Sequence, residues 1–418
     1  MPVLTRRRAL GVLAGAAGLT VGARLALPRF LRVGEPRPLD AETRAFVERC
    51  FDGIDRTMIW DSHVHLVGLG QGGTGCEIGS ELRSPFRHPI KNLQLAVYMA
   101  AAGITDEARA DETYVRRLLA LHHLANPDGK LLLLAFDRYV DAQGDEIAAR
   151  SEMYTPNDYV LAIANAHPEV RACASVHPYR RDALDRLQRA HDGGALAVKW
   201  LPNAMGIDPA SPRCDPFYRR LVDLRLPLIT HAGREQAVDA RDAQALGNPL
   251  RLRRPLDAGV TVVAAHFASL GDDDDLDRGH GGARVPCFDL LLRLFGERAY
   301  VRTLFADISA LTQVNRCERP LRTLLTSPEL HGRLVNGSDY PLPAIDPVIS
   351  TRKLVREGYL TADERRLCNR VFDANPLLFD FVVKRTVKVE TAGVTHRFAP
   401  SVFESARLFD PARATALP

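Results

Sequence analysis

The chain has little excess charge of either sign. Its 418 residues include 55 Lys and Arg and 51 Asp and Glu, which gives a formal net charge of +4 at pH 7. A protein that binds nucleic acid through its phosphates carries a much larger basic excess, so we expect no nucleic-acid partner. The hydrophobic share of 46% and the charged share of 25% are those of a globular protein with a large core.

The seven cysteines show no C-x-x-C spacing, which excludes a zinc ribbon. An odd number also excludes complete pairing within the chain. Export would allow one or two disulfides, with Cys50, Cys76 and Cys214 as the candidates, but the sequence leaves their pairing open. Most of the cysteines are interpreted as small buried hydrophobic residues.

No apolar run is long enough for a confident membrane span. Residues 11–23 are rich in Gly and Ala and follow Arg6-Arg7-Arg8, a pattern that resembles a twin-arginine export signal. We therefore expect residues 1–27 to be a signal for the export machinery and the mature protein to be periplasmic or exported. A basic cytoplasmic tail and an uncleaved membrane anchor remain as alternatives.

Two other motifs are incomplete. Residues 68–75 are rich in Gly but lack the Lys-Ser/Thr pair of a phosphate-binding loop, so they are interpreted as an irregular loop. Residues 271–277 are acidic but lack the Gly and Glu positions of an EF-hand. A solvated run of charges is favoured there over a calcium site.

The motif that the chain does contain is a pair of histidines one residue apart, His63 and His65, at the end of an apolar stretch. On a strand, alternation points both imidazoles to the same face. Later apolar runs end in His231, His266 and Asp339. Side chains at the carboxyl ends of successive strands build the active site of a (β/α)8 barrel, so we expect these residues to gather there.

Strand-like and helix-like patterns alternate along the chain, which predicts a parallel sheet closed into a (β/α)8 TIM barrel. A long insertion after the first strand is expected to lie over the site. Residues 28–55 are interpreted as a linker and a helix over 41–51 that caps the barrel bottom, residues 56–385 as the barrel, and residues 386–418 as a tail packed on it. The expected strands are 60–66, 130–136, 170–176, 195–202, 226–231, 262–266, 301–308 and 334–339.

The order of these ligand types, His-x-His on the first strand, His on the fifth and sixth and Asp on the eighth, resembles the amidohydrolase superfamily, and within it the amidohydrolase-related branch. The resemblance covers roughly residues 56–385. It implies a divalent metal, with Zn²⁺ as the expected ion, held by His63, His65, His231 and Asp339. It also implies that Asp339 takes the proton of the attacking water, and that His266 binds a second metal or polarises the substrate carbonyl.

Lys199, at the end of the fourth expected strand, bears on the number of metals. In members of the superfamily with two metals a carboxylated lysine at this strand bridges them, whereas many relatives with one metal carry a basic residue that serves structure or substrate. The resemblance favours one metal, and Lys199 with His266 would allow two.

Five further residues are candidates for contact with a small-molecule substrate. Arg234 could hold a carboxylate through two hydrogen bonds, with a salt bridge to a neighbouring loop as the alternative. The others lie at or just beyond strand ends, where packing or local hydrogen bonding is the alternative role: His177, Trp200, Asn203 and Tyr340. A hydrolase of amides, esters or lactones is favoured over a lyase acting on small unsaturated carboxylic acids, and both over a non-catalytic binding protein. Assembly as a homo-oligomer is left open.

The export signal can be tested directly. We expect residues 1–40, fused to a reporter that works only after folded export, to carry the reporter out of the cytoplasm, because twin-arginine export depends on the arginine pair. Replacing Arg6 and Arg7 by lysine should stop this transport, measured as reporter activity in the exported fraction. Undiminished export of the double-lysine fusion would contradict the twin-arginine interpretation.

Overall fold

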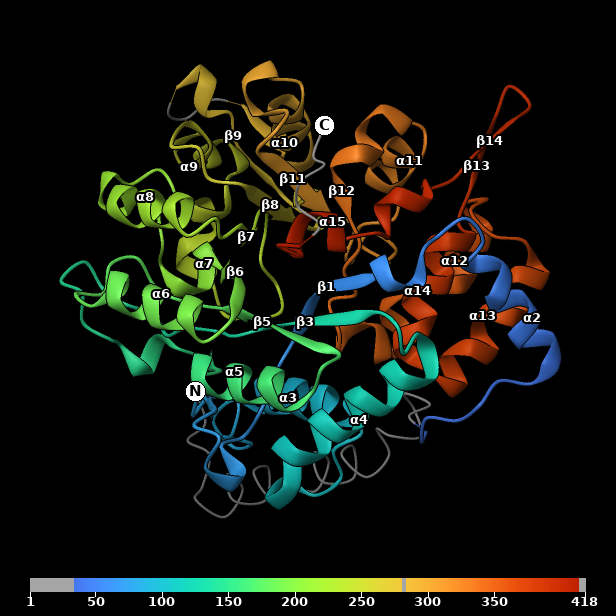
Figure 1. The fold of residues 1–418 in the computed structure, drawn as a ribbon, viewed down its shortest axis with the longest axis horizontal. Coiled ribbons are helices and arrows are strands. Elements are labelled where there is room, and N and C mark those ends of the chain that lie inside the picture. The colour runs from blue at the N-terminus through green and yellow to red at the C-terminus, as the bar shows by residue number, and fades with distance from the viewer. Residues whose placement is uncertain (1–33, 280–282, 413–418) are drawn as a thin grey trace, which may run out of the picture.

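Eight parallel strands form one sheet at the centre of the protein (Figure 1). The computed structural model describes residues 34–279 and 283–412, so the expected export signal lies outside the described residues. Each strand lies within its predicted range and is shorter than predicted. In their order in the sheet, the strands are β1 (Trp60–His65), β3 (Lys130–Leu134), β5 (Val170–Ala174), β6 (Ala195–Trp200), β7 (Leu228–His231), β8 (Val262–Ala265), β11 (Leu304–Asp307) and β12 (Leu334–Val335).

The sheet closes on itself between β1 and the segment that follows β12. Ser62 N–H donates to Asn336 O at 3.0 Å, Asp339 N–H donates to His63 O at 2.8 Å, and His65 N–H donates to Tyr340 O at 3.0 Å. These bonds satisfy backbone groups that would otherwise be buried and unpaired at the two edge strands. The predicted (β/α)8 barrel is therefore confirmed.

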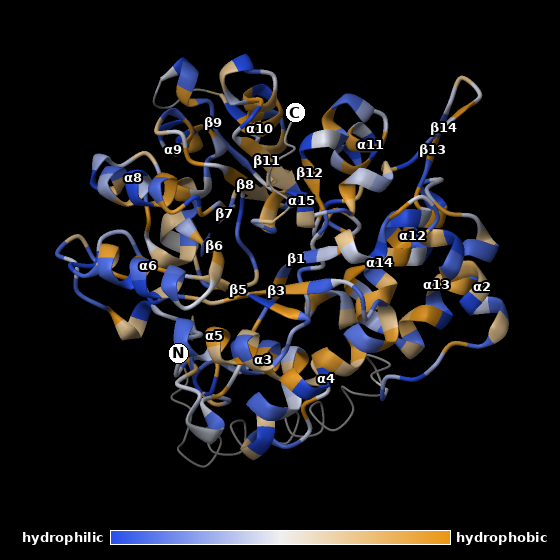
Figure 2. Cartoon of the chain, viewed as in Figure 1, coloured by the Kyte–Doolittle hydropathy of each residue, from blue (hydrophilic) through white to orange (hydrophobic). Residues whose placement is uncertain are grey.

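Helices surround the sheet, and Figure 2 shows both hydrophobic and hydrophilic residues on most of them. On α10 (Cys287–Phe295), for example, Phe288, Leu291 and Leu294 are buried while Arg293 is exposed. Burial of each such apolar side chain stabilises the fold by about 1.5–3 kcal/mol. The helices that follow the insertion are α5 (Asn157–Ala166), α6 (Ala183–Asp192), α7 (Pro202–Met205), α8 (Asp215–Asp223), α9 (Arg253–Asp257), α10 (Cys287–Phe295), α11 (Arg319–Leu325), α12 (Thr351–Arg356), α13 (Ala362–Ala374) and α14 (Pro376–Thr386).

The barrel interior is filled from alternate positions of the strands, such as Leu132, Ile229 and Phe305. The C-terminal helix α15 (Ala406–Phe409) packs against this interior cluster through Leu408 and Phe409. It does so at the end of the barrel where Trp60 begins β1, so the tail seals the barrel bottom.

The prediction that the helix over 41–51 caps the barrel bottom is wrong. That helix, α2 (Ala41–Cys50), contacts α13 and α14 on the outside of the barrel (Figure 1). Its buried face, with Phe46, Val47 and Cys50, joins the core that these helices share.

The insertion between β1 and β3 contains α3 (Pro89–Ala101), α4 (Ala110–Ala125) and β2 (Glu77–Ile78), which pairs antiparallel with β4 (Met153–Tyr154). Its Gly-rich loop folds around the buried carboxylate of Asp111. That carboxylate accepts hydrogen bonds from Leu69 N–H at 2.6 Å, Gly70 N–H at 3.1 Å and the Thr74 hydroxyl. A Cβ at Gly68 would lie 2.3 Å from Asp111 Oδ2, so this position needs glycine.

The acidic run after β8 lies in a hairpin of β9 (Asp272–Asp274) and β10 (Arg284–Pro286). Asp275 and Asp277 both pair with Arg293 at 2.7 Å. Arginine therefore neutralises two of these carboxylates. A second hairpin, β13 (Val389–Thr391) and β14 (Val394–His396), projects from the body of the protein (Figure 1).

All seven cysteines lie among the described residues, and each is a buried free thiol. The expected disulfide from Cys50, Cys76 or Cys214 is therefore not formed. Burial raises the pKa of the Cys76 thiol to about 11 and that of Cys214 to about 12, which keeps both protonated and unreactive at neutral pH. Among the described residues, no helix combines the length and apolarity needed to span a membrane.

Candidate metal centre

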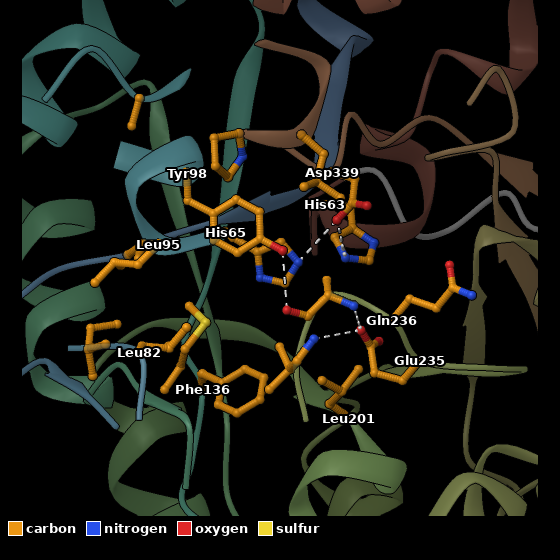
Figure 3. Close-up of a pocket in the computed structure, with 18 of the residues that line it drawn as sticks. His63, His65, Leu82, Leu95, Tyr98, Phe136, Leu201, Glu235, Gln236 and Asp339 are labelled. Atoms are coloured by element: carbon orange, nitrogen blue, oxygen red, sulfur yellow. Dashed lines mark hydrogen bonds and ion pairs between the residues drawn. The ribbon is translucent and has the colours of Figure 1, made fainter. Parts of the chain in front are cut away.

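Three of the residues predicted as metal ligands meet at the carboxyl end of the barrel. His65 Nε2 lies 3.1 Å from Asp339 Oδ1, and His63 Nε2 lies 3.6 Å from the same oxygen. Ligand atoms of all three residues lie within 4.8 Å of one another. Figure 3 shows His63, His65 and Asp339 side by side at one end of the cavity. Two imidazoles and a carboxylate at this spacing can share one divalent ion.

The contact that closes the barrel, between β1 and the segment after β12, is called the seam here. It places Asp339 next to His63 and His65. A Cβ at Gly337 would lie 2.5 Å from His63 Cβ, so only glycine lets the turn after β12 pass so close to β1. Asp339 itself has a left-handed φ of 62°. The Asp61 carboxylate accepts hydrogen bonds from Ser338 N–H at 2.7 Å and from His63 N–H at 3.3 Å. It thus fixes the backbone on both sides of the seam.

The ring of His63 is oriented from behind by Asp307, at the end of β11. His63 Nδ1 lies 2.9 Å from Asp307 Oδ2. Burial raises the pKa of Asp307, but the charge and the hydrogen bond of His63 lower it by more. The pKa of Asp307 therefore lies well below the usual range. The ionised carboxylate accepts the Nδ1 proton, so the lone pair of Nε2 faces His65 and Asp339.

His231 and His266 are anchored through Nδ1 in the same way. His231 Nδ1 lies 3.3 Å from Glu235 Oε2, and its buried Nε2 has no hydrogen-bond partner among the described residues. Burial lowers the pKa of His231 to about 4 and that of His266 well below its usual value, so both rings are neutral. A buried imidazole nitrogen without a partner is the atom that a metal ion would satisfy.

The tautomer of His266 follows from Ser309. The Ser309 hydroxyl donates to Asp307, so its oxygen accepts the proton of His266 Nδ1 at 2.7 Å. Neutral His266 therefore presents the lone pair of Nε2 to the cavity. In this state it can bind a metal or accept a proton, whereas polarising a carbonyl would require a proton on Nε2.

The imidazole rings form a continuous row. The ring centroids of His63 and His65 are 5.1 Å apart, those of His63 and His266 are 5.0 Å apart, and those of His266 and His231 are 5.3 Å apart. The donor set of neutral imidazoles and carboxylate, with the partnerless nitrogen of His231, fits a divalent cation such as zinc.

Lys199 also points into the site. It lies on β6, is buried, and places Nζ 3.2 Å from His63 Nε2. Burial lowers the pKa of the Lys199 amine. Because a charged ammonium here would donate to the lone pair that a metal needs, metal binding at His63 favours an uncharged Lys199.

A cavity of about 230 Å³ lies against these residues. Its polar end carries His63, His65, Lys199, His231, His266 and Asp339. Every residue that the sequence analysis assigned to metal binding or catalysis therefore lines this cavity, although His231 does not belong to the group of ligand atoms within 4.8 Å that His63, His65 and Asp339 form.

The five predicted substrate contacts do not line this cavity. Trp200 faces outward, because it neighbours the inward-pointing Lys199 on the same strand, and its Nε1–H donates to Val176 O at 2.8 Å. Tyr340 is buried edge-on against Tyr114. Both pack in the hydrophobic core instead of facing a substrate.

Of the other three residues, Asn203 lies in α7, and His177 and Arg234 lie in the loops that follow β5 and β7. Asn203 donates to Gly233 O at 3.1 Å, and His177 lies 2.9 Å from Met205 O, so both hold neighbouring backbone. Arg234 is exposed on the loop after β7, outside the cavity. For His177 and Asn203 the structure favours the local hydrogen bonding that was kept as the alternative.

The sequence analysis did not assign four residues that orient or line the site: Glu235, Asp307, Ser309 and Arg316. Asp307 ends a strand, as His231 does, and the same strand-end rule applied to 301–308 would have found it. Glu235 lies four residues after His231. Arg316 lies in a loop without a periodic pattern, and no signal in the sequence marks it.

No family model and no curated protein matches the chain. Solved structures do share similarity with it. An uncharacterised TIM-barrel protein from Bordetella bronchiseptica is 15% identical, with 75% of this chain and 98% of that one covered and a TM-score of 0.45. A putative 2-pyrone-4,6-dicarboxylic acid hydrolase from Pseudomonas putida is 18% identical, covering 77% and 97%, with a TM-score of 0.38. A 5-carboxyvanillate decarboxylase from Sphingomonas paucimobilis is 11% identical, covering 84% and 98%, with a TM-score of 0.46.

The role of Asp307 can be tested by metal affinity. We expect Asp307→Asn to weaken binding of Zn²⁺ by roughly 10- to 100-fold, because the ring of His63 loses the carboxylate that fixes its tautomer. Competition with a chromophoric chelator measures this affinity. Asp289→Asn, which removes a carboxylate paired with Arg319, is the matched control and should bind metal like the wild type. Equal affinities for all three proteins would contradict the role given to Asp307.

Proposed function

We propose that this protein is a metal-dependent enzyme of the amidohydrolase superfamily, which hydrolyses an amide, ester or lactone bond of a small molecule. The observation that carries the proposal is the meeting of His63, His65 and Asp339 at the barrel end, in a cavity that is also lined by His231, whose buried Nε2 has no partner among the described residues. The order of these ligands along the chain supports the same family. The neighbouring structures include enzymes described as hydrolases and as decarboxylases, and their low similarity assigns neither reaction to this chain.

His63, His65, His231 and Asp339 would hold the metal, with zinc as the expected ion. Bound there, the metal would act as a Lewis acid and would lower the pKa of a water bound to it to near neutrality. Burial raises the pKa of Asp339, but the hydrogen bond from His65 and the charges of both histidines lower it below the usual value. Asp339 is therefore ionised at neutral pH and ready to take a proton from the attacking water.

The remaining side chains orient this machinery. Asp307 and Glu235 hold His63 and His231, and the apolar wall of the cavity keeps bulk water away from the reacting bond. His266, with its Nε2 lone pair toward the cavity, is placed to receive a proton. We favour a single metal, since Lys199 Nζ approaches His63 Nε2 directly.

A lyase acting on an unsaturated carboxylic acid is the second candidate. It requires a cation that holds a carboxylate, and Arg316, a buried arginine in the cavity, would supply one. A screen of metal-loaded protein against lactones, acyl amides and unsaturated diacids separates the two reactions. Release of carboxylate and alcohol or amine supports the hydrolase, and release of CO₂ or addition of water to a double bond supports the lyase.

On the substrate found by this screen, we expect Asp339→Asn to lower kcat/KM by more than a thousandfold, because the variant keeps a metal-binding oxygen but loses the base. His63→Ala should be inactive as well. Both should keep the circular dichroism spectrum of the wild type, because the ligands lie at the barrel end and contribute little to its core. Activity of Asp339→Asn within about tenfold of wild type, a barrier change of only about 1.4 kcal/mol, would remove Asp339 from the proposed role.

A further inference from the structure

The cavity over the metal ligands has two chemically different ends. In Figure 3 Leu82 and Leu95 lie on one side of it, and His63 and Asp339 lie on the other. The apolar end is formed largely by the insertion between β1 and β3. We call this end the insertion chamber and define it by Leu69, Ile78, Leu82, Leu95, Met99 and Ile104.

The insertion chamber is a prebuilt apolar surface. Leu69, Ile78, Leu82 and Leu95 form a hydrophobic cluster of their own, and each is at most 9% exposed. Because these side chains pack on one another, the wall they present does not need a ligand in order to be held in place. An apolar cavity of this kind gains free energy by taking up an apolar group and offers no hydrogen bonds to a polar one.

Arg316 supplies the opposite chemistry at the polar end. Arg316 is 8% exposed and lines the cavity together with Gln313 and Asn315. The guanidinium donates one side-chain hydrogen bond, from Nη1 to Ser269 Oγ at 3.1 Å, and its buried Nε has no partner. Within the part of the chain that the structure describes, no carboxylate lies within ion-pair distance of it.

The nearby carboxylates are already engaged. Asp339 lies against His65, Glu235 against His231, and Asp307 against His63. Burial lowers the pKa of Arg316, and these three charges oppose that effect. A guanidinium stays charged because its ordinary pKa lies far above neutrality. A buried charge with unused donors is costly unless a ligand completes its hydrogen bonds, and a carboxylate does so with two at once.

We propose that the substrate is an amphipathic anion, whose apolar body fills the insertion chamber and whose carboxylate binds Arg316. The apolar body is an aromatic ring or an acyl chain, and the reacting bond faces His63, His65 and Asp339. This inference rests on the proposed function for the reaction, but it concerns binding and can be tested without turnover.

The test is calorimetric titration of the metal-loaded protein with butanoate, hexanoate, octanoate and decanoate, and with the matching primary amides. We expect affinity to rise roughly fourfold for each added methylene until the chamber is full, the gain from burying one CH₂ group. Each carboxylate should bind roughly tenfold tighter than its amide, as a charge-assisted hydrogen bond does relative to a neutral one.

Variants assign each effect to its residue. Arg316→Gln should remove the preference for carboxylate over amide and keep the dependence on chain length. Arg302→Gln, at an exposed arginine just before β11 and thus at the other end of the barrel, should change neither. Leu95→Phe should move the best chain length to a shorter chain and Leu95→Ala to a longer one, with folding checked by circular dichroism.

Three results would overturn the inference: equal binding of acids and amides, no dependence on chain length, or an acid preference that survives Arg316→Gln and disappears when the metal is removed. The last result would put the anion on the metal. Failure of the proposed reaction is a separate outcome. A protein that binds octanoate through Arg316 but hydrolyses no ester, amide or lactone would keep this inference and lose the hydrolase.

Discussion

The centre of the molecule depends on one buried hydrogen bond, between His63 Nδ1 and the Asp307 carboxylate. It decides which nitrogen of His63 carries the proton, and so which nitrogen faces the metal site. The same carboxylate accepts the backbone N–H of His266 at 2.8 Å and that of Ser309 at 3.0 Å. One side chain on β11 thereby orients residues from β1, from the turn after β8 and from its own loop. The site is fixed by the barrel even before a metal binds.

The seam of the barrel both closes the sheet and positions a residue of the site. The bonds that close the sheet between β1 and the segment after β12 also bring Asp339 to His65. Helix α14 supports this turn from outside, where Lys384 Nζ donates to Gly337 O at 2.6 Å and pairs with Asp380 at 2.5 Å. Burial raises the pKa of Asp380 to about 7, and the charge and hydrogen bond of Lys384 oppose that rise. The Lys384 ammonium thereby holds the backbone of the turn that leads to Asp339.

The sequence predicted the barrel and the candidate ligands at its carboxyl end because both follow from local patterns. A strand buried on both faces is a continuous apolar run, and the residue that ends it lies at the rim, so His231 and Asp339 could be placed without coordinates. The same alternation could have excluded Trp200, since Lys199 and Trp200 cannot both face inward. The pocket contacts proposed from loops were not found in the cavity, because a loop such as the one that carries Arg234 has no period that fixes its direction. Arg316 and the sealing helix α15 depend on contacts between distant segments, which one sequence does not reveal.

We propose that His63, His65, His231 and Asp339 hold one divalent metal. The most direct test of this proposal is a crystal structure of the zinc-loaded protein with anomalous diffraction measured on both sides of the zinc edge. We expect one peak, bonded to the Nε2 atoms of these histidines and to an oxygen of Asp339, with Lys199 unmodified. A peak between His63 Nδ1, His266 and Asp307 would contradict this ligand set, as would two peaks bridged by a carboxylated Lys199.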